Sequence, residues 1–459
     1  MKVAIAYPPL KSKKGTPLLS QNRQFQWFNN PTYIYPLVPA MLATLLQKYG
    51  DEVLWLDGIA ENLSYQQWVE KLLQFQPDLL VMETKTPVIK QHWQIIKKLK
   101  TKNAKLKIAL VGDHVTALAQ ESRKHCPADY IISGGNYDLT LLSILKGIKI
   151  NRLDDLPLID RNLTKWQLYA DKNGNYKYPP GTYIMSGRDC WWRQNGGCTF
   201  CSWTTLYPQF QVRSAANVLN EVGQLIKLGV KEIFDDTGTF PAGVWLRQFC
   251  RGLIKRGYHR KIVFGCNLRF GVLTQEDYQL MAKANFRFLL FGLESANQIT
   301  LDKLNKGIKI DQVETELQVI NKYKNLEPHV TCMVGYPWET YQQAQNTVQF
   351  TKRLFQQGLI NSLQATIVIP YPGTKLFSQA KKNQWLKTLD WDRYDMREPI
   401  LKSPLTQPQI KQLTRSIYLS ALTPKFLLKK LTSIHSIADL KFLFKTAKKF
   451  LGQLSDFSV

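Results

Sequence analysis

The stretch Thr182–Trp203, TYIMSGRDCWWRQNGGCTFCSW, holds three of the seven cysteines of this 459-residue chain. Its first apolar residues, 183–185, predict a short buried strand. Cys190, Cys198 and Cys201 follow in a glycine-containing loop, the last two as a C-x2-C pair. Thiolates grouped in this way are the usual protein ligands of iron–sulfur clusters. A closed zinc site needs a fourth ligand, and no nearby cysteine or histidine offers an obvious one.

The composition narrows the class of protein. The apolar fraction is 44%, and no stretch reaches the roughly 18 uninterrupted apolar residues that a membrane span needs. The N-terminus, MKVAIAYPPL, has too short an apolar part for a secretory signal and predicts a first buried strand. We therefore expect a cytoplasmic protein, in which clustered cysteines favour metal chemistry over disulfides. The net charge of +26 fits either a solvated basic surface or an anionic partner.

Residues 1–150 alternate between strand and helix patterns. Strands are predicted at 2–6, 52–56, 78–82, 106–111 and 129–132, and helices at 38–49, 65–75 and 88–99. This βαβ order predicts an open, doubly wound, Rossmann-like parallel sheet, which binds ligands beyond the carboxyl ends of its strands. No G-x-G-x-x-G follows the first strand, so a nicotinamide or flavin dinucleotide is not expected.

A second α/β unit follows a linker that is rich in turn-forming residues, at 151–180. Six strands are predicted over 181–387, at 183–185, 232–234, 261–264, 288–291, 330–334 and 365–369, with helices between them. Six β/α units are too few for an eight-stranded barrel, so the pattern predicts an open, partial barrel of the TIM type. Its chemistry is expected at the carboxyl ends of the strands.

The remainder, residues 388–459, is predicted to be helical and basic. In 439–454, apolar residues share one face at helical spacing, namely Leu440, Leu443, Phe444, Ala447, Phe450, Leu451 and Leu454. The lysines at 441, 445, 448 and 449 mostly occupy the other face. A helix that packs on the barrel explains this pattern, and the alternative is a surface helix that rests on anionic lipid.

The cysteine loop resembles the signature of the radical S-adenosylmethionine (SAM) enzymes, three cysteines that end in C-x2-C with an aromatic residue before the last. Phe200 occupies that aromatic position and is expected to contact the cofactors. The resemblance implies a [4Fe-4S] cluster held by Cys190, Cys198 and Cys201, with one iron left open for SAM. The sequence departs from the common pattern in one respect, because seven residues separate the first two cysteines where three are usual. The alternative is that these are ordinary small core residues.

Three later strand ends resemble the SAM-binding segments of the same enzymes. Phe291–Ser295 resembles the segment whose carboxylate, here Glu294, binds the ribose or methionine of SAM, since a carboxylate accepts two charge-assisted hydrogen bonds. Asp235 and Asp236 fall where the family has its amino-group-binding motif, and Arg269 could meet the SAM carboxylate. For each of these charged residues a structural salt bridge is the alternative.

The N-terminal unit resembles the cobalamin-binding domain that precedes the barrel in one branch of this family. The resemblance implies cobalamin contacts at the strand ends, from Tyr7, Thr84, Thr86, Gly112, Asp113, His114, Thr116, Gly134 and Gly135. The D-x-x-H-x-x-G motif that supplies a lower axial histidine in other cobalamin proteins is absent, so His114 is not assigned to cobalt. A degenerate domain that has lost cobalamin is the alternative.

Together these resemblances imply a cobalamin-dependent radical SAM enzyme, similar to the class B methyltransferases, that methylates an unactivated carbon. One alternative is a non-methylating enzyme with the same cofactors, such as an oxidative cyclase or a ring-rearranging enzyme. Another is a basic RNA- or membrane-associated module with relic sites. The implied partners are a small-molecule, lipid or peptide substrate and an electron donor such as flavodoxin or ferredoxin. Contact of the C-terminal helices with the inner membrane face, and binding of nucleic acid, stay open.

Overall fold

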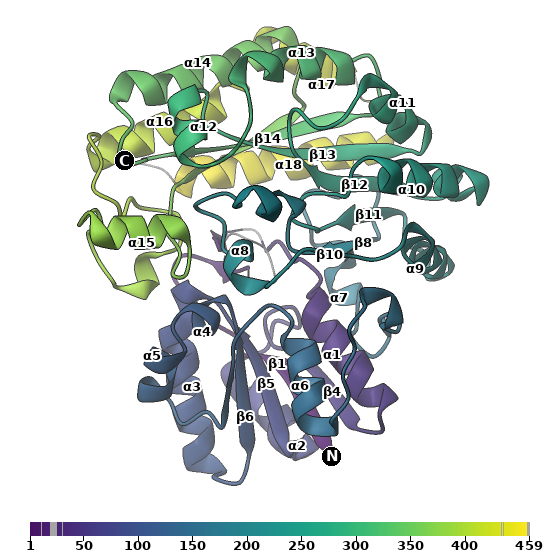
Figure 1. Cartoon of the computed structure of the whole chain (residues 1–459), viewed down its shortest axis with the longest axis vertical. Helices are drawn as coiled ribbons and strands as arrows, with labels where there is room; N and C mark the ends of the chain where they lie inside the picture. Colours follow the sequence, from purple (N-terminus) through teal and green to yellow (C-terminus); the bar gives the residue numbers. More distant parts are fainter. Residues whose placement is uncertain (11, 19–24, 30, 433, 435, 457–459) are drawn as a thin grey trace.

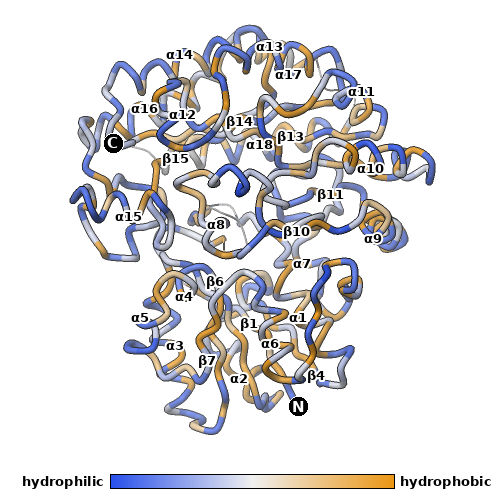
Figure 2. The backbone as a smooth tube through the Cα atoms, in the orientation of Figure 1, coloured by the Kyte–Doolittle hydropathy of each residue, from blue (hydrophilic) through white to orange (hydrophobic). Residues whose placement is uncertain are grey.

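The computed structural model describes residues 1–10, 12–18, 25–29, 31–432, 434 and 436–456. They form an N-terminal α/β unit at one end of the molecule and a larger α/β unit at the other (Figure 1). Hydrophobic residues are concentrated in the strands, and hydrophilic residues occupy the outer loops (Figure 2). No helix of the described ranges is both long and apolar enough to cross a membrane.

The N-terminal unit is a parallel sheet with the strand order β4-β1-β5-β6-β7. The strands are β1 (Lys2–Tyr7), β4 (Glu52–Asp57), β5 (Leu79–Thr84), β6 (Lys107–Gly112) and β7 (Tyr130–Ile132). Alternate β1 residues pack on opposite faces. Val3 and Ile5 share a core with α1 (Leu37–Lys48) and α6 (Tyr137–Lys146), whereas Ala4 and Ala6 share one with α2 (Tyr65–Phe75) and α3 (Ile89–Lys102). The predicted doubly wound sheet is confirmed.

The second unit is a parallel sheet with the order β15-β14-β13-β12-β11-β8. Its strands are β8 (Gly181–Ile184), β11 (Glu232–Asp235), β12 (Val263–Leu268), β13 (Phe286–Glu294), β14 (Glu327–Val334) and β15 (Ser362–Ile367). The intervening helices include α9 (Ala215–Lys227), α10 (Val244–Lys255), α11 (Gln275–Lys283), α13 (Ile310–Ile320) and α14 (Tyr341–Gln357). Among the described strands β8 and β15 do not pair, which confirms the open, partial barrel.

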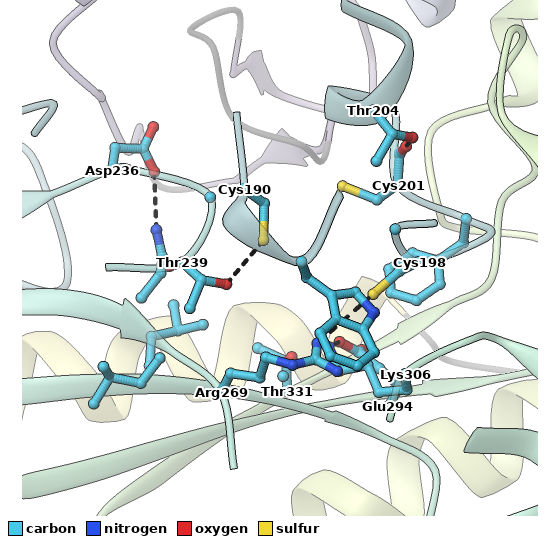
Figure 3. Close-up of a pocket in the computed structure, with 18 of the residues that line it drawn as sticks. Cys190, Cys198, Cys201, Thr204, Asp236, Thr239, Arg269, Glu294, Lys306 and Thr331 are labelled. Atoms are coloured by element: carbon cyan, nitrogen blue, oxygen red, sulfur yellow. Dashed lines mark hydrogen bonds and ion pairs between the residues drawn. The ribbon is translucent and has the colours of Figure 1, made fainter. Parts of the chain in front are cut away.

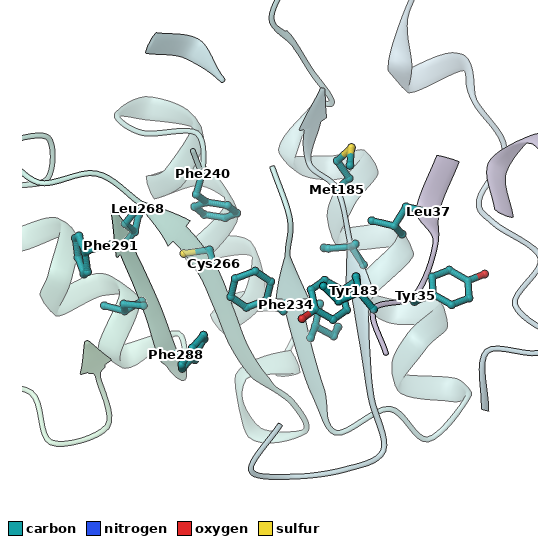
Figure 4. Close-up of a cluster of buried hydrophobic side chains, with 14 of the residues drawn as sticks. Tyr35, Leu37, Tyr183, Met185, Phe234, Phe240, Cys266, Leu268, Phe288 and Phe291 are labelled. Atoms are coloured by element: carbon teal, nitrogen blue, oxygen red, sulfur yellow. The ribbon is translucent and has the colours of Figure 1, made fainter. Parts of the chain in front are cut away.

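One hydrophobic core runs through the barrel into the N-terminal unit. Tyr183 of β8 and Phe234 of β11 belong to the same buried cluster as Tyr35 and Leu37, which lie just before and at the start of α1 (Figure 4). A buried bidentate contact joins the units as well, because Arg188 donates to both carboxylate oxygens of Asp138 on α6, at 2.8 and 2.5 Å. These contacts set the carboxyl ends of the barrel strands against the N-terminal unit.

The C-terminal helices cover the open side of the barrel. They are α16 (Gln407–Leu419), α17 (Pro424–Thr432) and α18 (Ile437–Asp456), and α18 runs across the barrel sheet (Figure 1). Tyr418 Oη donates to the carbonyl of Ala365 on β15 at 2.7 Å, and the ring of Phe450 on α18 packs against Tyr418 with 6.5 Å between ring centroids. The helix α18 therefore packs on the barrel, which is the first of the two interpretations of its apolar pattern.

The apolar face predicted for α18 is only partly packed on the barrel. Phe450 and Leu454 pack on the core, but Phe444 and Leu451 are 69% and 65% exposed. Lys449 lies on the packed side, where its Nζ contacts the loop that contains Asn175. The side of α18 that faces the barrel also includes Phe442 and Thr446, which lie outside the predicted stripe, so the helix is turned about its axis and one edge of the stripe is left in solvent.

Candidate functional site

A cavity of about 170 Å³ lies at the carboxyl ends of the barrel strands (Figure 3). Barrel strands and the loops that follow them contribute to its lining, which includes Cys190, Cys198, Cys201, Asp236, Arg269 and Glu294. Figure 3 shows the three thiols on one side of this space and Arg269 and Glu294 on the other. The structure therefore brings together side chains that lie more than one hundred residues apart in the sequence.

The long interval between the first two cysteines folds as a 3-10 helix. This helix, η3 (Trp191–Asn195), is followed by Gly196, whose φ of +84° reverses the chain. Trp192 Nε1 donates to the carbonyl of Asn305 at 2.7 Å, and Asn305 Nδ2 donates back to the carbonyl of the last η3 residue at 2.7 Å. The additional residues thus form a braced turn, and Cys190 still lines the same cavity as the other two thiols.

The donor set suits a cluster better than a single ion. The three thiols are partly exposed. Burial raises the pKa of Cys198, and the nearby cations of Lys306 and Arg269 oppose that rise by favouring the thiolate. In the described ranges no three His, Cys, Asp or Glu residues are grouped to hold one metal ion. Each thiolate of a cluster binds a different iron, so the ligands surround a volume rather than a point, and three thiols around one cavity fit a [4Fe-4S] group.

Glu294 is held in an unusual backbone conformation at the end of β13. Its φ is +71°, and the pairing of β13 with β14 shifts register between Gly292 and Glu294. Such a bulge re-aims a side chain, and strained backbone of this kind is concentrated at functional sites. Lys306 Nζ donates to Glu294 Oε1 at 2.8 Å, and both residues are buried. A Cβ on Gly292 would lie 2.4 Å from Glu294 Oε1, so only glycine leaves room for this pair.

Arg269 presents an unsatisfied donor beside the thiols. Its guanidinium stacks on Trp192 at 3.8 Å from the ring centroid, and its Nη1 lies 4.0 Å from Cys198 Sγ. Its Nη2 is buried and has no hydrogen-bond partner among the described residues. A buried guanidinium donor that is left unpaired is costly, so the position fits a carboxylate ligand such as that of SAM.

The two adjacent aspartates after β11 have different surroundings. Asp235 accepts hydrogen bonds from the backbone of Ser186 at 3.0 Å and of Thr237 at 2.9 Å, so it braces the end of β8 and does not line the cavity. Burial raises the pKa of Asp235. Asp236 lines the cavity, with Asn267 Nδ2 at 3.5 Å from its Oδ1. Of this predicted pair, Asp236 is therefore the one placed to reach a ligand.

Sequence reasoning missed Lys306 as a member of the site, and it gave Thr239 no role of its own within the segment 235–239 that resembles the amino-group-binding motif. Lys306 follows a short helix in the stretch LNKG, where nothing in the spacing marks it, yet its Nζ lies 5.7 Å from the ring centroid of the predicted contact Phe200. Thr239 Oγ1 lies 3.1 Å from Cys190 Sγ. A polar residue shortly after a strand end is the one signal that could have indicated Thr239.

The residues expected to contact cobalamin lie at the carboxyl ends of β1, β5, β6 and β7 and in the turns that follow, namely Tyr7, Thr84, Thr86, Gly112, Asp113, His114, Thr116, Gly134 and Gly135. Most of their polar side chains bond within the domain. Tyr7 donates to Glu83 at 2.5 Å, Thr84 Oγ1 contacts His92 Nδ1 at 2.7 Å, and Thr116 Oγ1 donates to the carbonyl of Gly112 at 2.6 Å. These contacts fix the shape of the sheet edge.

His114 is enclosed and is not placed to bind cobalt. Its ring is fully buried between Trp93 and Trp391, with centroids 5.9 and 5.4 Å away, and its Nε2 lies 3.4 Å from Glu121. The glycines after β7 pack against the segment that follows the cysteine loop, because Gly135 N–H donates to the carbonyl of Leu206 at 2.7 Å and a Cβ on Gly135 would lie 2.6 Å from the ring of Tyr207. His114 therefore offers no axial ligand to a corrin from this position.

Residues 186–351 match the radical SAM superfamily, a range that holds the three cysteines, Asp236, Arg269 and Glu294. The chain is also similar to an uncharacterized methyltransferase, PH0819, from Pyrococcus horikoshii. The two are 27% identical over 437 residues, which cover 87% of this chain and 90% of that protein.

Two solved structures resemble the whole chain. One is the radical SAM methyltransferase TsrM from Kitasatospora setae, with cobalamin and a [4Fe-4S] cluster bound, at a TM-score of 0.66 and 12% identity over all of both chains. The other is the cobalamin-dependent SAM radical enzyme OxsB, with aqua-cobalamin and SAM bound, at a TM-score of 0.64 and 14% identity. That match covers 99% of this chain and 72% of OxsB. At such low identity the likeness establishes a shared fold.

Proposed function

We propose that this chain, which carries a radical SAM domain, is a cobalamin-dependent radical SAM enzyme that methylates an unactivated carbon. The observation that carries the proposal is the convergence of three thiols with Arg269 and Glu294 in one cavity at the carboxyl edge of a partial barrel. The similarity to a methyltransferase over most of both chains, and the shared fold of TsrM, support it.

Each cofactor has a set of residues that would hold it. Cys190, Cys198 and Cys201 would bind the cluster, Arg269 would pair with the SAM carboxylate, and Glu294 would bind its ribose or methionine. The strand ends of the N-terminal unit would contact the periphery of cobalamin. When bound, the cluster and SAM supply a 5′-deoxyadenosyl radical for hydrogen abstraction, and methylcobalamin supplies the methyl group.

The side chains of this protein bind and orient the cofactors. Arg269 is already stacked on Trp192 and Glu294 is already paired with Lys306, so neither has to reorganise much before it meets SAM. Both are less than 7% exposed, and in such a site their charges act with little screening by water. Phe200 and Leu290 add apolar walls that would keep water from a reactive radical.

The test is anaerobic reconstitution with iron, sulfide, cobalamin, SAM and a reductant. Cluster absorbance together with formation of 5′-deoxyadenosine and S-adenosylhomocysteine would support methyl transfer. Formation of 5′-deoxyadenosine alone would favour the non-methylating alternative. Absence of both products and of cluster absorbance would contradict the proposal that the chain is a radical SAM enzyme. Cys198→Ala should lose the cluster, whereas Cys126→Ala, a buried thiol of the N-terminal unit, should keep it.

The wider setting is part of the same proposal. We place the enzyme in the cytoplasm, with a small-molecule, lipid or peptide substrate and flavodoxin or ferredoxin as electron donor. Peripheral contact with the inner membrane face is proposed through α17 and α18, whose outer sides expose leucine, isoleucine and phenylalanine side chains. The relic-module alternative is disfavoured, because the family match and the complete set of thiols argue for retained chemistry.

A further inference from the structure

A second cavity, of about 310 Å³, lies between the open side of the barrel and the C-terminal helices. We call it the chamber. Its walls are mainly apolar and include Leu18, Phe28, Phe288, Leu363, Leu422 and Phe450. Its size is within the range of about 300–1,000 Å³ that small-molecule sites occupy. Polar and charged side chains, among them Arg287, Glu327 and Lys449, contribute the rest of the lining.

The chamber borders the cavity that holds the three thiols. The two share five lining residues, Ile34, Asn175, Tyr183, Leu290 and Gln364, so these side chains form the wall between them. A molecule in the chamber would lie next to the place where the proposed chemistry occurs, and it would reach the thiols by displacing side chains of this wall.

Among the described residues, three cations, Arg287, Lys430 and Lys449, and one carboxylate, Glu327, line the chamber. Arg287 is paired with Glu232 at 2.6 Å and with Glu327 at 2.5 Å. Lys449 of α18 also lines the chamber, but it forms no ion pair with any described carboxylate, and its Nζ lies 3.4 Å from Asn175 Oδ1. Burial lowers the pKa of Lys449 to about 8, so its amine is mostly protonated at neutral pH. A desolvated ammonium favours a site that receives an anion.

The helices that wall the chamber also carry an apolar outer surface. On α17, Leu428 and Leu431 are each 62% exposed, and on α18, Ile437 and Phe444 are 74% and 69% exposed. Exposed lysines at 441 and 448 lie on the same helix. Apolar side chains flanked by lysines suit the surface of an anionic membrane, so the chamber lies directly behind a face that could meet lipid.

We propose that the chamber binds an anionic amphiphilic lipid, with its apolar chain against the Phe and Leu walls and its anionic group at Lys449, and that this lipid is the substrate. The second part rests on the proposed function. The apolar walls, the absence of a described carboxylate partner for Lys449 and the apolar outer face of the helices together support an anionic lipid.

A structural role for Lys449 makes a different prediction. Lys445 Nζ donates to the carbonyls of Asp171 and Asn173, and Lys449 could act with it to hold α18 on this loop. In that case removal of the Lys449 charge would loosen the helix and weaken binding of every chamber ligand equally. If Lys449 instead binds the anionic group of a ligand, removal of its charge should weaken the binding of an anionic ligand more than that of a neutral ligand of equal length.

The experiment measures displacement of cis-parinaric acid fluorescence from the full-length protein by palmitate and by hexadecanol. Lys449→Met should weaken palmitate binding about tenfold or more, the loss expected for one charge-assisted contact, and leave hexadecanol unchanged. Lys448→Met, the exposed neighbour, is the matched control and should change neither. Equal affinity of Lys449→Met and wild type for palmitate would refute the proposal that Lys449 binds the anionic group. An equal loss of affinity for palmitate and hexadecanol would refute it as well.

A second variant tests the chamber itself. Leu443→Trp, at a half-buried position of the chamber wall, would fill part of the space and should abolish binding of both ligands, whereas Leu451→Trp, 65% exposed on the same helix, should preserve it. Unchanged binding to Leu443→Trp, or no binding to wild type, would refute the lipid site. Because these measurements need no turnover, absence of 5′-deoxyadenosine in a lipid-binding protein would contradict only the proposed chemistry.

Discussion

A methyl group at Gly292 should disable the proposed SAM site without unfolding the barrel. The φ of Gly292 lies outside the left-handed region, so its backbone tolerates alanine. The added Cβ would lie 2.4 Å from Glu294 Oε1 and 2.6 Å from Lys306 Nζ, about 1 Å short of ordinary contact. The carboxylate and the ammonium must therefore move apart or swing into the cavity.

The size of the effect follows from that displacement. Loss of a charge-assisted hydrogen bond costs about 1.5–3 kcal/mol, which corresponds to about 10- to 100-fold in affinity. A shift of about 1 Å in a positioning group can lower a rate by about 100-fold. We expect Gly292→Ala to bind SAM about 10- to 100-fold more weakly, as measured by anaerobic titration calorimetry, and to retain its cluster absorbance.

A double-mutant cycle identifies the cause. If the methyl group acts through Glu294, then Gly292→Ala should add little to the loss already produced by Glu294→Gln. Two results would refute the reasoning. One is SAM binding by Gly292→Ala within about twofold of wild type, and the other is a loss that adds fully to that of Glu294→Gln.

Three further predictions concern the cluster, the corrin and the outer helices. Cys190→Ala should lose the visible absorbance of the cluster while Cys126→Ala keeps it, and a normal cluster in the first variant would show that the long loop supplies no ligand from this position. The electron paramagnetic resonance spectrum of bound cob(II)alamin should show no nitrogen coupling from His114, so His114→Ala should leave that coupling pattern unchanged; loss of a nitrogen coupling in the variant would contradict this. Phe444→Glu should reduce co-sedimentation with vesicles that contain phosphatidylglycerol, whereas Ile299→Glu, 59% exposed on the barrel, should not; equal sedimentation of both variants would contradict the membrane face.

Local sequence patterns predicted most of the fold. Buried strands of a parallel sheet are continuous apolar runs, and their helices show apolar spacing of three and four, so both are visible in short windows. The strand β11, predicted at 232–234, is Glu232–Asp235 in the structure, and the helix predicted at 65–75 is α2 at the same residues. The strands β12 and β13, predicted to end at 264 and 291, end at Leu268 and Glu294, so both extend further toward the site than predicted.

The candidate site was predicted in outline because its residues follow strand ends. Parallel strands bring their carboxyl ends to one edge, so the cysteines, Arg269 and Glu294 had to come close once the barrel formed. The sequence could not decide between Asp235 and Asp236. Successive side chains at the end of a strand point to opposite sides, and the contact of Asp235 with Ser186 depends on the register of β8 against β11.

The sequence by itself determined the two α/β units, the three thiols and the set of charged residues at the barrel edge, because these depend on order along the chain and on short-range periodicity. Only the tertiary structure decided that Lys306 pairs with Glu294, that Gly292 makes room for them, and that the apolar stripe of α18 is divided between a chamber and an exposed face. Those features depend on contacts between segments that are remote in sequence or on the area that a neighbour can cover, and no local pattern encodes either.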